Sequence, residues 1–167
     1  MSVVGFLQQL HDSQLGTALR ESLYMFPLVE GTHLIGLALS VGLILVTDLR
    51  LVGLFLRNVP VADVLQQLRP WVLAGFAITF GTGILLIWAE GPRIWQIPVF
   101  PLKLVLIALA GINAIWFEFK YGKTISVWGD SEGFPQGAKL AGWVSLVSWS
   151  AVVICGRLIP YLDATQH

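Results

Sequence analysis

Four long apolar stretches constrain the fold of this chain more than any other feature. They run approximately over residues 23–46, 72–88, 102–119 and 138–159. A helix of about 20 predominantly apolar residues is long enough to cross the roughly 30 Å hydrocarbon core of a bilayer. Backbone groups in lipid must find their hydrogen bonds within the protein, so each stretch predicts one spanning helix. The sequence therefore predicts an all-α integral membrane bundle of four transmembrane helices.

The composition agrees with a lipid environment. Hydrophobic residues make up 56% of the chain and charged residues only 12%, whereas about a quarter of the residues of a soluble domain are charged. The formal net charge is zero and no basic run stands apart from a span end, which argues against a nucleic-acid partner. Little sequence remains outside the spans, so we expect residues 1–167 to form a single transmembrane domain with the lipid bilayer as its partner.

Residues 1–22 have a different pattern. Their apolar side chains alternate with polar ones at nearly helical spacing; the apolar set is Val3, Phe6, Leu7, Leu10, Leu15 and Leu19. This spacing predicts an amphipathic helix that lies in the membrane interface. The segment lacks a basic n-region and a small-residue cleavage site, so we expect no removable signal peptide.

The distribution of Lys and Arg predicts the orientation. The linkers after the first and third spans carry Arg50, Arg57, Arg69, Lys120, Lys123 and Lys139. The opposite side carries Arg20, Arg93, Lys103 and Arg157. Cytoplasmic loops hold an excess of these residues, so both termini are expected outside. In a bacterial inner membrane the termini would then be periplasmic.

Tryptophans fall where an aromatic belt requires them. Those at or near span ends are Trp71, Trp88, Trp95, Trp116 and Trp143. Trp149 falls deeper in the fourth span, so its indole N–H is expected to need a hydrogen-bond partner.

Ionisable residues form two layers at the ends of the spans. The outer layer comprises Glu30, His33, Glu90, Lys103 and Arg157, and the inner layer comprises Asp48, Arg50, Arg69, Glu118 and Lys120. Long charged side chains at span ends reach the interface and anchor the helix. We expect Asp48 and Arg50 to act as such anchors, and the same interpretation is open for Glu90, Lys103 and Arg157.

Glu30 and His33 are harder to explain as anchors because they lie inside the first span. They are three residues apart, so both side chains share one helical face. Ionisable groups within a span are costly and suggest a functional site. Glu30 is expected to be neutral, hydrated or paired with Lys103 or Arg157.

Three interpretations of His33 are open. It is a structural histidine that hydrogen-bonds Glu30 or a neighbouring helix, a ligand to haem iron or copper, or a proton relay with Glu30. A haem with two histidine ligands needs a second imidazole. His11 could supply it by folding back onto the outer mouth, as could His33 of a symmetry-related subunit; the remaining histidine is the last residue, His167. Alternatively the iron is five-coordinate.

The other motifs indicate helix packing rather than a catalytic or binding site. Glu30-x-x-His33 is half of the di-iron carboxylate pattern, which needs a second such motif on another helix. Gly81-Thr82-Gly83 lies in an apolar run and lacks the setting of a phosphate loop. Cys155 is interpreted as a small packing residue. Thr79, Thr82 and Asn113 are expected to supply interhelical hydrogen bonds.

A set of elements spread over nearly the whole chain resembles a family of small bacterial inner-membrane proteins of unknown function. These elements are Tyr24 to Gly36, Asp48-Leu49-Arg50-Leu51, Pro70-Trp71, Thr82-Gly83, Phe100 followed by Lys103, and Asn113. The family has a looser similarity to copper-resistance D and b-type cytochrome membrane domains. The resemblance implies four membrane helices and carries no established activity. Ile97-Pro98 stands where Asn-Pro is common in that family.

The favoured functional hypothesis is a redox or metal-related role at an outward-facing site. His33 binds b-haem or copper, Glu30 orients the ligand or carries a proton, and Lys103 or Arg157 balances charge or meets a haem propionate; His11 is a further candidate ligand. One alternative is a non-enzymatic accessory or assembly subunit, within a homo-oligomer or a larger membrane complex. The other is translocation of protons or a small molecule. No catalytic residue is assigned.

Overall fold

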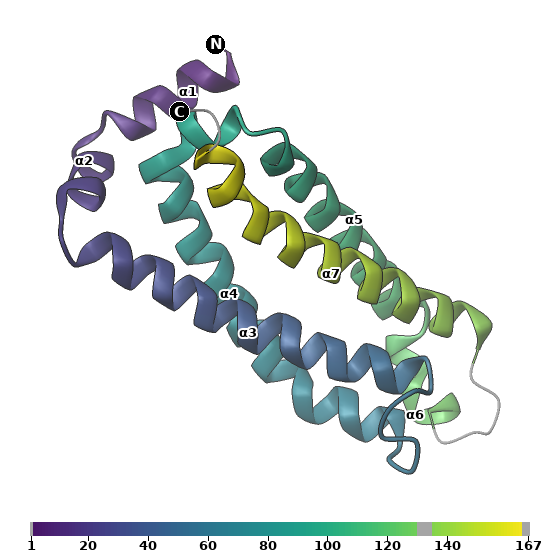
Figure 1. The fold of residues 1–167 in the computed structure, drawn as a ribbon. Coiled ribbons are helices and arrows are strands. Elements are labelled where there is room, and N and C mark those ends of the chain that lie inside the picture. The colour runs from purple at the N-terminus through teal and green to yellow at the C-terminus, as the bar shows by residue number, and fades with distance from the viewer. Residues whose placement is uncertain (1, 130–134, 165–167) are drawn as a thin grey trace.

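The computed structural model describes residues 2–129 and 135–164, and in this part of the chain every regular element is a helix (Figure 1). The elements are α1 (Val3–His11), α2 (Gln14–Glu21), α3 (Met25–Leu51), α4 (Val61–Trp95), α5 (Val99–Lys120), the 3-10 turn η1 (Gly122–Thr124), α6 (Ile125–Trp128) and α7 (Gln136–Ala164). The helices α3, α4, α5 and α7 are long and apolar enough to cross a membrane. The predicted all-α fold with four membrane helices is confirmed.

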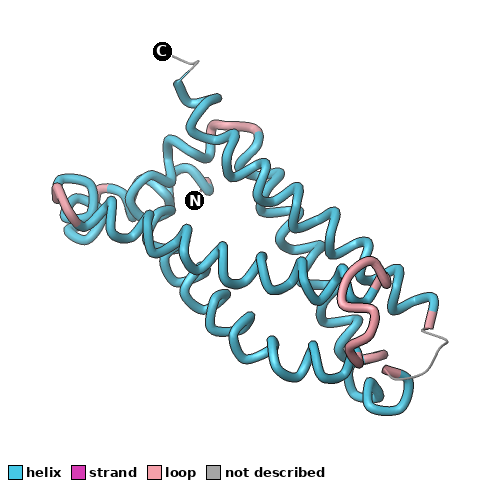
Figure 2. Tube along the Cα trace, turned by 60° about the horizontal axis from the view of Figure 1, so that its bottom comes forward, coloured by secondary structure: helices cyan, strands magenta, loops and turns pink. Residues whose placement is uncertain are grey.

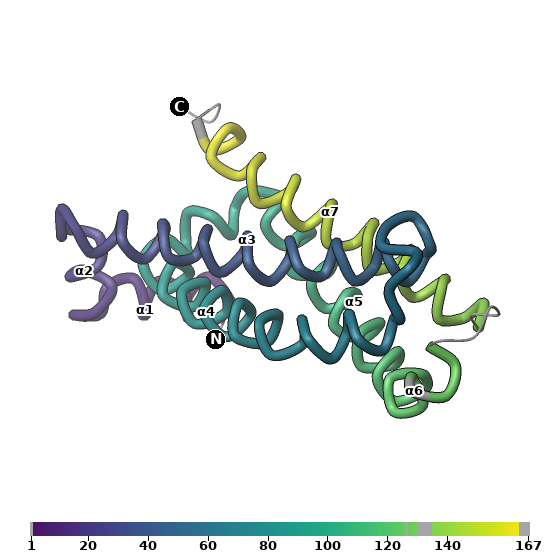
Figure 3. Tube along the Cα trace, turned by 90° about the horizontal axis from the view of Figure 1, so that it is seen from below, coloured from purple at the N-terminus to yellow at the C-terminus, as the bar shows by residue number. Residues whose placement is uncertain are grey.

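The long helices form two pairs. α3 packs on α4 and α5 packs on α7, with α3 also touching α7, whereas α4 and α5 touch only over a short stretch (Figures 1 and 3). The two termini lie at the same end of the bundle, together with α1 and α2, and α6 lies at the other end (Figure 1). We call these the terminal end and the α6 end. Short loops join most of the helices (Figure 2).

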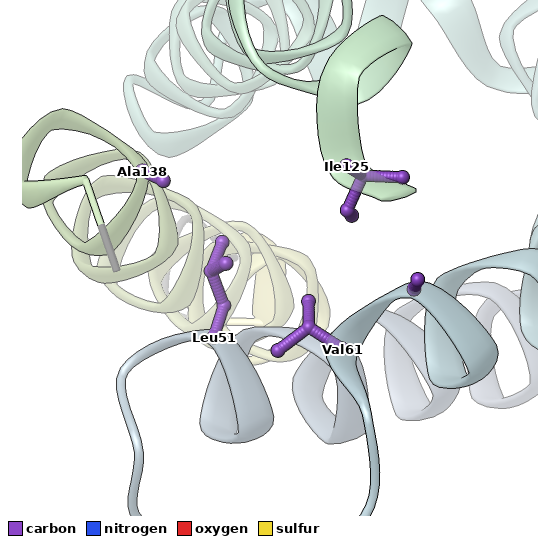
Figure 4. Packing of buried hydrophobic residues seen from close by; sticks show 5 residues of the cluster. Leu51, Val61, Ile125 and Ala138 are labelled. Atoms are coloured by element: carbon purple, nitrogen blue, oxygen red, sulfur yellow. The ribbon is translucent and has the colours of Figure 1, made fainter. Parts of the chain in front are cut away.

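The second long helix begins earlier than the sequence predicted. The second apolar stretch was expected to begin near residue 72, but α4 begins at Val61 and contains Pro70 within it. A proline inside a helix removes one backbone hydrogen bond. Packing explains why the helix continues: Val61 and Ala62 are buried against Leu51 and Ile125 at the α6 end (Figure 4). Burial of these apolar side chains stabilises the first turns of α4 despite the proline.

Small residues bring α3 and α4 into backbone contact where they cross. A Cβ added at Gly36 would lie 2.8 Å from Thr79 Oγ1, and one added at Gly75 would lie 2.7 Å from Ser40 N. The hydroxyls of Ser40 and Thr79 donate within their own helices, to Gly36 O at 2.9 Å and to Gly75 O at 2.8 Å. The crossing therefore depends on close van der Waals contact, as small-residue interfaces in membranes do.

The N-terminal segment forms two helices instead of the single one expected. Ser13 separates them because its hydroxyl accepts from Gly16 N at 3.2 Å and caps α2. The same hydroxyl accepts a hydrogen bond from Trp88 Nε1 at 2.9 Å, which ties this corner to α4. Leu7 of α1 is buried beside Gly91 of α4. Exposed apolar side chains such as Phe6 remain available for the membrane interface.

The crossing generates a prediction. Replacing Gly75 with Ala forces α3 and α4 apart, because the new methyl group would overlap the Ser40 backbone. We expect a loss of about 1–3 kcal/mol in the free energy of unfolding, as for other overpacked sites. Gly81→Ala is the matched control, since a Cβ there meets nothing within 4 Å. Unfolding in mixed micelles measures both variants, and equal stability of the two would contradict this account of the crossing.

Candidate functional site

His33 lies just on the terminal side of the α3–α4 crossing. It is half-buried, and its ring lies against Gly83, where an added Cβ would come within 3.2 Å of His33 Cε1. His33 Nδ1 is 3.0 Å from Thr82 Oγ1. Thr82 therefore makes the interhelical hydrogen bond that the sequence predicted for it, and Gly83 provides the room for the ring.

The contacts of Thr82 determine the tautomer of His33. The Thr82 hydroxyl has a single proton, and its other neighbours are the carbonyls Ile78 O at 2.6 Å and Thr79 O at 3.2 Å. Carbonyls only accept, so the hydroxyl proton is donated to them and its oxygen accepts from His33. In neutral His33 the proton is then on Nδ1, and Nε2 keeps its lone pair free to bind a metal or a proton.

The Nδ1 atom of His11 likewise contacts an oxygen atom of α4. Its Nδ1 is 2.6 Å from Ala89 O, and because a carbonyl only accepts, this nitrogen carries a proton. Arg20 Nη1 donates to His11 O at 2.6 Å and fixes the end of α1. Ala89 and Thr82 are seven residues apart, which is about two turns and about 10 Å along α4. Both histidines are therefore attached to the same face of α4 on the terminal side of the crossing.

Lys103 is a cation without an ionic partner in residues 2–129 and 135–164. It makes no hydrogen bond or ion pair there, and its ammonium lies beside α7, 3.4 Å from where a Cβ of Gly156 would be. Lys103 and Glu30 are both within electrostatic reach of His33. The structure thus brings three of the candidate residues, His33, Lys103 and Glu30, into one region toward the terminal end of the spans.

The expected pairing of Glu30 is not formed in the described chain. Glu30 is exposed on α3 and makes no ion pair with Lys103 or Arg157. Arg157 is also exposed, and its Nη2 donates to Tyr161 OH at 2.9 Å. Arg157 therefore remains a candidate only as a surface charge at the terminal end.

Glu90 is a structural residue at the terminal end. Its carboxylate is 2.9 Å from Arg93 Nε, and Arg93 Nη1 is 3.2 Å from Asp163 Oδ2. The ion pairs join the end of α4 to the end of α7, which agrees with an anchoring role for this charge.

The interpretation of Asp48 and Arg50 as interfacial anchors was wrong. Their exposed fractions are only 7% and 5%. Arg50 turns back to hold the loop before α4, because its Nε donates to Val59 O at 2.6 Å. Asp48 faces the bundle interior, where Ser145 hydrogen-bonds its carboxylate. Packing of the two helix pairs encloses both groups, an effect that hydropathy along one helix does not reveal.

A cavity of about 410 Å³ lies between the two helix pairs on the α6 side of the crossing. Most of its lining is apolar, and its polar lining residues are Thr47, Asp48, Arg69, Asn113, Glu118 and Ser145. Arg69 of α4 forms an ion pair with Glu118 of α5. Asn113 Nδ2 donates to Ala141 O at 2.9 Å and joins α5 to α7. Sequence reasoning missed this cavity; the charged Asp48 and the deep Trp149 were its only signals.

Within the described ranges no group of three or more His, Cys, Asp or Glu side chains is placed to hold a metal ion. A metal bound at His33 would therefore need ligands from elsewhere. His167 lies outside the described residues.

These features define an integral membrane helix bundle with a polar site near one end of its spans and a cavity near the other. The chain belongs to DUF6644, a family of unknown function, whose profile matches residues 21–162. The match includes His33, Lys103 and the cavity, and it begins after His11. No curated protein and no solved structure matches the chain significantly.

The Thr82 contact generates a prediction about His33. In the wild-type protein, nitrogen NMR of labelled histidine at neutral pH is expected to show the Nδ1–H tautomer for His33. Thr82→Val keeps the size of the side chain and removes the acceptor, so the population of the Nε2–H tautomer should rise. The His11 signal serves as the internal control, since its partner is Ala89 O. An unchanged His33 signal in Thr82→Val would contradict the assignment.

Proposed function

We propose that this protein is a redox protein of the bacterial inner membrane that binds a b-type haem near its outer face, with His33 as an axial ligand. The observation that supports this proposal is the hydrogen bond from His33 Nδ1 to Thr82. Histidines that bind metals commonly donate their second ring nitrogen to an oxygen, which fixes the ring and leaves the other nitrogen for the metal.

The donor set favours haem over copper. Copper in proteins draws its ligands from several side chains, and no group of three or more such side chains exists among the described residues. Haem iron brings four nitrogens of its own and needs only one or two axial ligands from the protein. A single well-oriented histidine is therefore sufficient for haem. When bound, haem would supply one-electron redox chemistry.

His11 is the best candidate for a second axial ligand. Its Nδ1–H is held by Ala89 O, so its Nε2 is free, and its contact point is on the same face of α4 as that of His33. If His11 does not bind, the iron is five-coordinate, or a second copy of the chain supplies its own His33. The spin state of the iron separates the five-coordinate alternative from the two six-coordinate ones, and the variant His11→Ala separates those two from each other.

Charges near His33 support the same ligand. Lys103 is half-buried and has no ionic partner in the described chain, and a cation partly removed from water is stabilised by a nearby anion. A haem propionate would be such an anion. Glu30 is exposed and lies within electrostatic reach of His33, so it is suited to exchange a proton with water at the outer surface.

The same topology supports the proposed location. Both termini lie at one end of the bundle, and the positive-inside rule assigns that end to the periplasm. The haem would then face the periplasmic side. The contacts give less support to proton translocation, because the hydroxyls of Ser40 and Thr79 donate within their own helices and form no link between the outer site and the cavity.

The absorption spectrum of protein purified from its native membrane tests the proposal. We expect a Soret band and about one haem per chain or per dimer. His33→Ala should lose the band, because the axial ligand is gone. His11→Ala should keep the haem and shift the iron from six-coordinate low spin to five-coordinate high spin if His11 is the second ligand.

Thermal unfolding of each variant provides the control for folding. If wild-type protein contains neither haem nor stoichiometric copper or iron, or if His33→Ala keeps an unchanged spectrum, the proposal is rejected. A loss of stability or of oligomer in His33→Ala without any cofactor would instead favour the accessory or assembly role.

A further inference from the structure

The cavity on the α6 side of the crossing has the size and composition of a ligand site. Its volume of about 410 Å³ lies in the range of roughly 300–1,000 Å³ found for small-molecule pockets, which are mostly apolar with a few oriented polar groups. It is separated from His33 by the α3–α4 crossing. Its occupant is therefore independent of the haem proposed above.

Asp48, which lines the cavity, has an unused hydrogen-bond acceptor. Its side chain is only 7% exposed, and while Ser145 hydrogen-bonds the carboxylate, Asp48 Oδ2 has no partner among the described residues. A buried polar atom without a partner is uncommon and costly. A donor on a ligand would satisfy it.

Trp149 also lines the cavity and has an unused hydrogen-bond donor. This residue lines the cavity and is only 6% exposed, and its indole N–H has no hydrogen-bond partner in the described ranges. The partner expected from the sequence is thus not supplied by these parts of the chain. Its ring packs against Phe76, with 5.0 Å between centroids. A hydroxyl group both donates and accepts, so it can serve Asp48 and Trp149 alike.

The remaining charges restrict the class of ligand. Arg69 and Glu118 at the cavity edge pair with each other, so together they add no net charge that would favour a charged head group. Asp48 disfavours an acidic ligand such as a fatty acid. An ammonium group would suit Asp48 but cannot accept from Trp149. An uncharged hydroxyl group can donate to Asp48 and accept from Trp149.

The walls favour a flat ring. Phe76, Phe80 and Phe117 line the cavity with Trp149, and aromatic side chains pack well against other rings in offset or edge-to-face arrangements. An aromatic ring that carries hydroxyl groups is therefore suited both to these walls and to the two unpaired polar groups.

The cavity opens sideways toward lipid between α4 and α5. Leu73, Phe80 and Ile115 line it and yet are 62%, 49% and 59% exposed. These residues belong to the two long helices that touch only over a short stretch. An apolar tail attached to the ring can thus remain in the bilayer while the head enters.

We propose that this cavity binds a lipid-soluble hydroquinone or related phenol from the bilayer, with its hydroxyls hydrogen-bonded to Asp48 and Trp149 and its tail between α4 and α5.

Equilibrium binding to the full chain in phosphatidylcholine nanodiscs tests this proposal. The probe is benzohydroquinone with a decyl tail, kept reduced under argon and corrected for partition into empty nanodiscs. The comparison compound is its dimethyl ether, which has the same ring and tail but no donor. We expect saturable binding of the hydroquinone and binding of the ether at least about tenfold weaker, because the hydrogen bond to a carboxylate is lost.

Two variants locate the site. Asp48→Asn keeps the side-chain shape but places an amide donor where the free acceptor was, and it should weaken hydroquinone binding at least about tenfold. Gly111→Leu should abolish binding, because Gly111 lines the cavity and a Cβ there meets nothing within 4 Å. Gly81→Leu is the matched control: its Cβ is equally unobstructed, but Gly81 is not among the lining residues.

Each outcome decides the proposal. Equal binding of the hydroquinone and its ether, or full binding by Gly111→Leu, would show simple partition into lipid and overturn it. Tighter binding of dodecylamine than of the hydroquinone would contradict the assignment of an uncharged head group to the ligand. His33→Ala should leave binding unchanged, and Asp48→Asn should leave any Soret band unchanged, so failure of this proposal is distinguishable from failure of the haem site.

Discussion

The close approach of α3 and α4 is the contact on which the rest of the structure depends. Gly36 and Gly75 let the backbones meet near Thr79 and Ser40, and lipid offers no hydrophobic drive that would hold two helices together without such contact. The crossing places the ring of His33 beside Gly83 and Thr82 on one side. On the other side it leaves α4 in only limited contact with α5, where the cavity forms. The α3–α4 crossing thus positions both candidate sites.

Much of the fold was predictable because its causes are local. Span number, helical class and the common side of the termini follow from runs of apolar residues and from their even number. The ends of the helices were less predictable, since Val61 extends α4 through packing with Leu51 and Ile125, which are distant in sequence. Ser13 divided the N-terminal segment by capping a helix, a role that the sequence alone does not distinguish from the roles of Ser2 and Ser22.

The candidate sites, like the fold, could be predicted from the sequence only in part. His33 was identified because an ionisable side chain inside a membrane span costs free energy. Thr82 was expected to make an interhelical hydrogen bond. Nothing in the sequence indicated that these two residues contact each other. Asp48 was misinterpreted because its position near a span end suggested access to the interface, whereas its burial depends on α7, which supplies Ser145. Burial of this kind is a property of helix pairing, which a single sequence does not encode in any short pattern.

The ion pairs at the two ends of α4 have a mechanical consequence. Arg69 joins α4 to Glu118 near the α6 end, and Arg93 joins it to Asp163 near the terminal end. Between them, no hydrogen bond connects α4 to α5 or α7 in the described chain. With respect to α5 and α7, α4 is therefore held at its two ends, while its middle is held by α3 at the crossing. Outward bowing of α4 together with α3 would widen the gap to α5 without breaking either ion pair, so the lipid side of the bundle can open while its two surfaces stay closed.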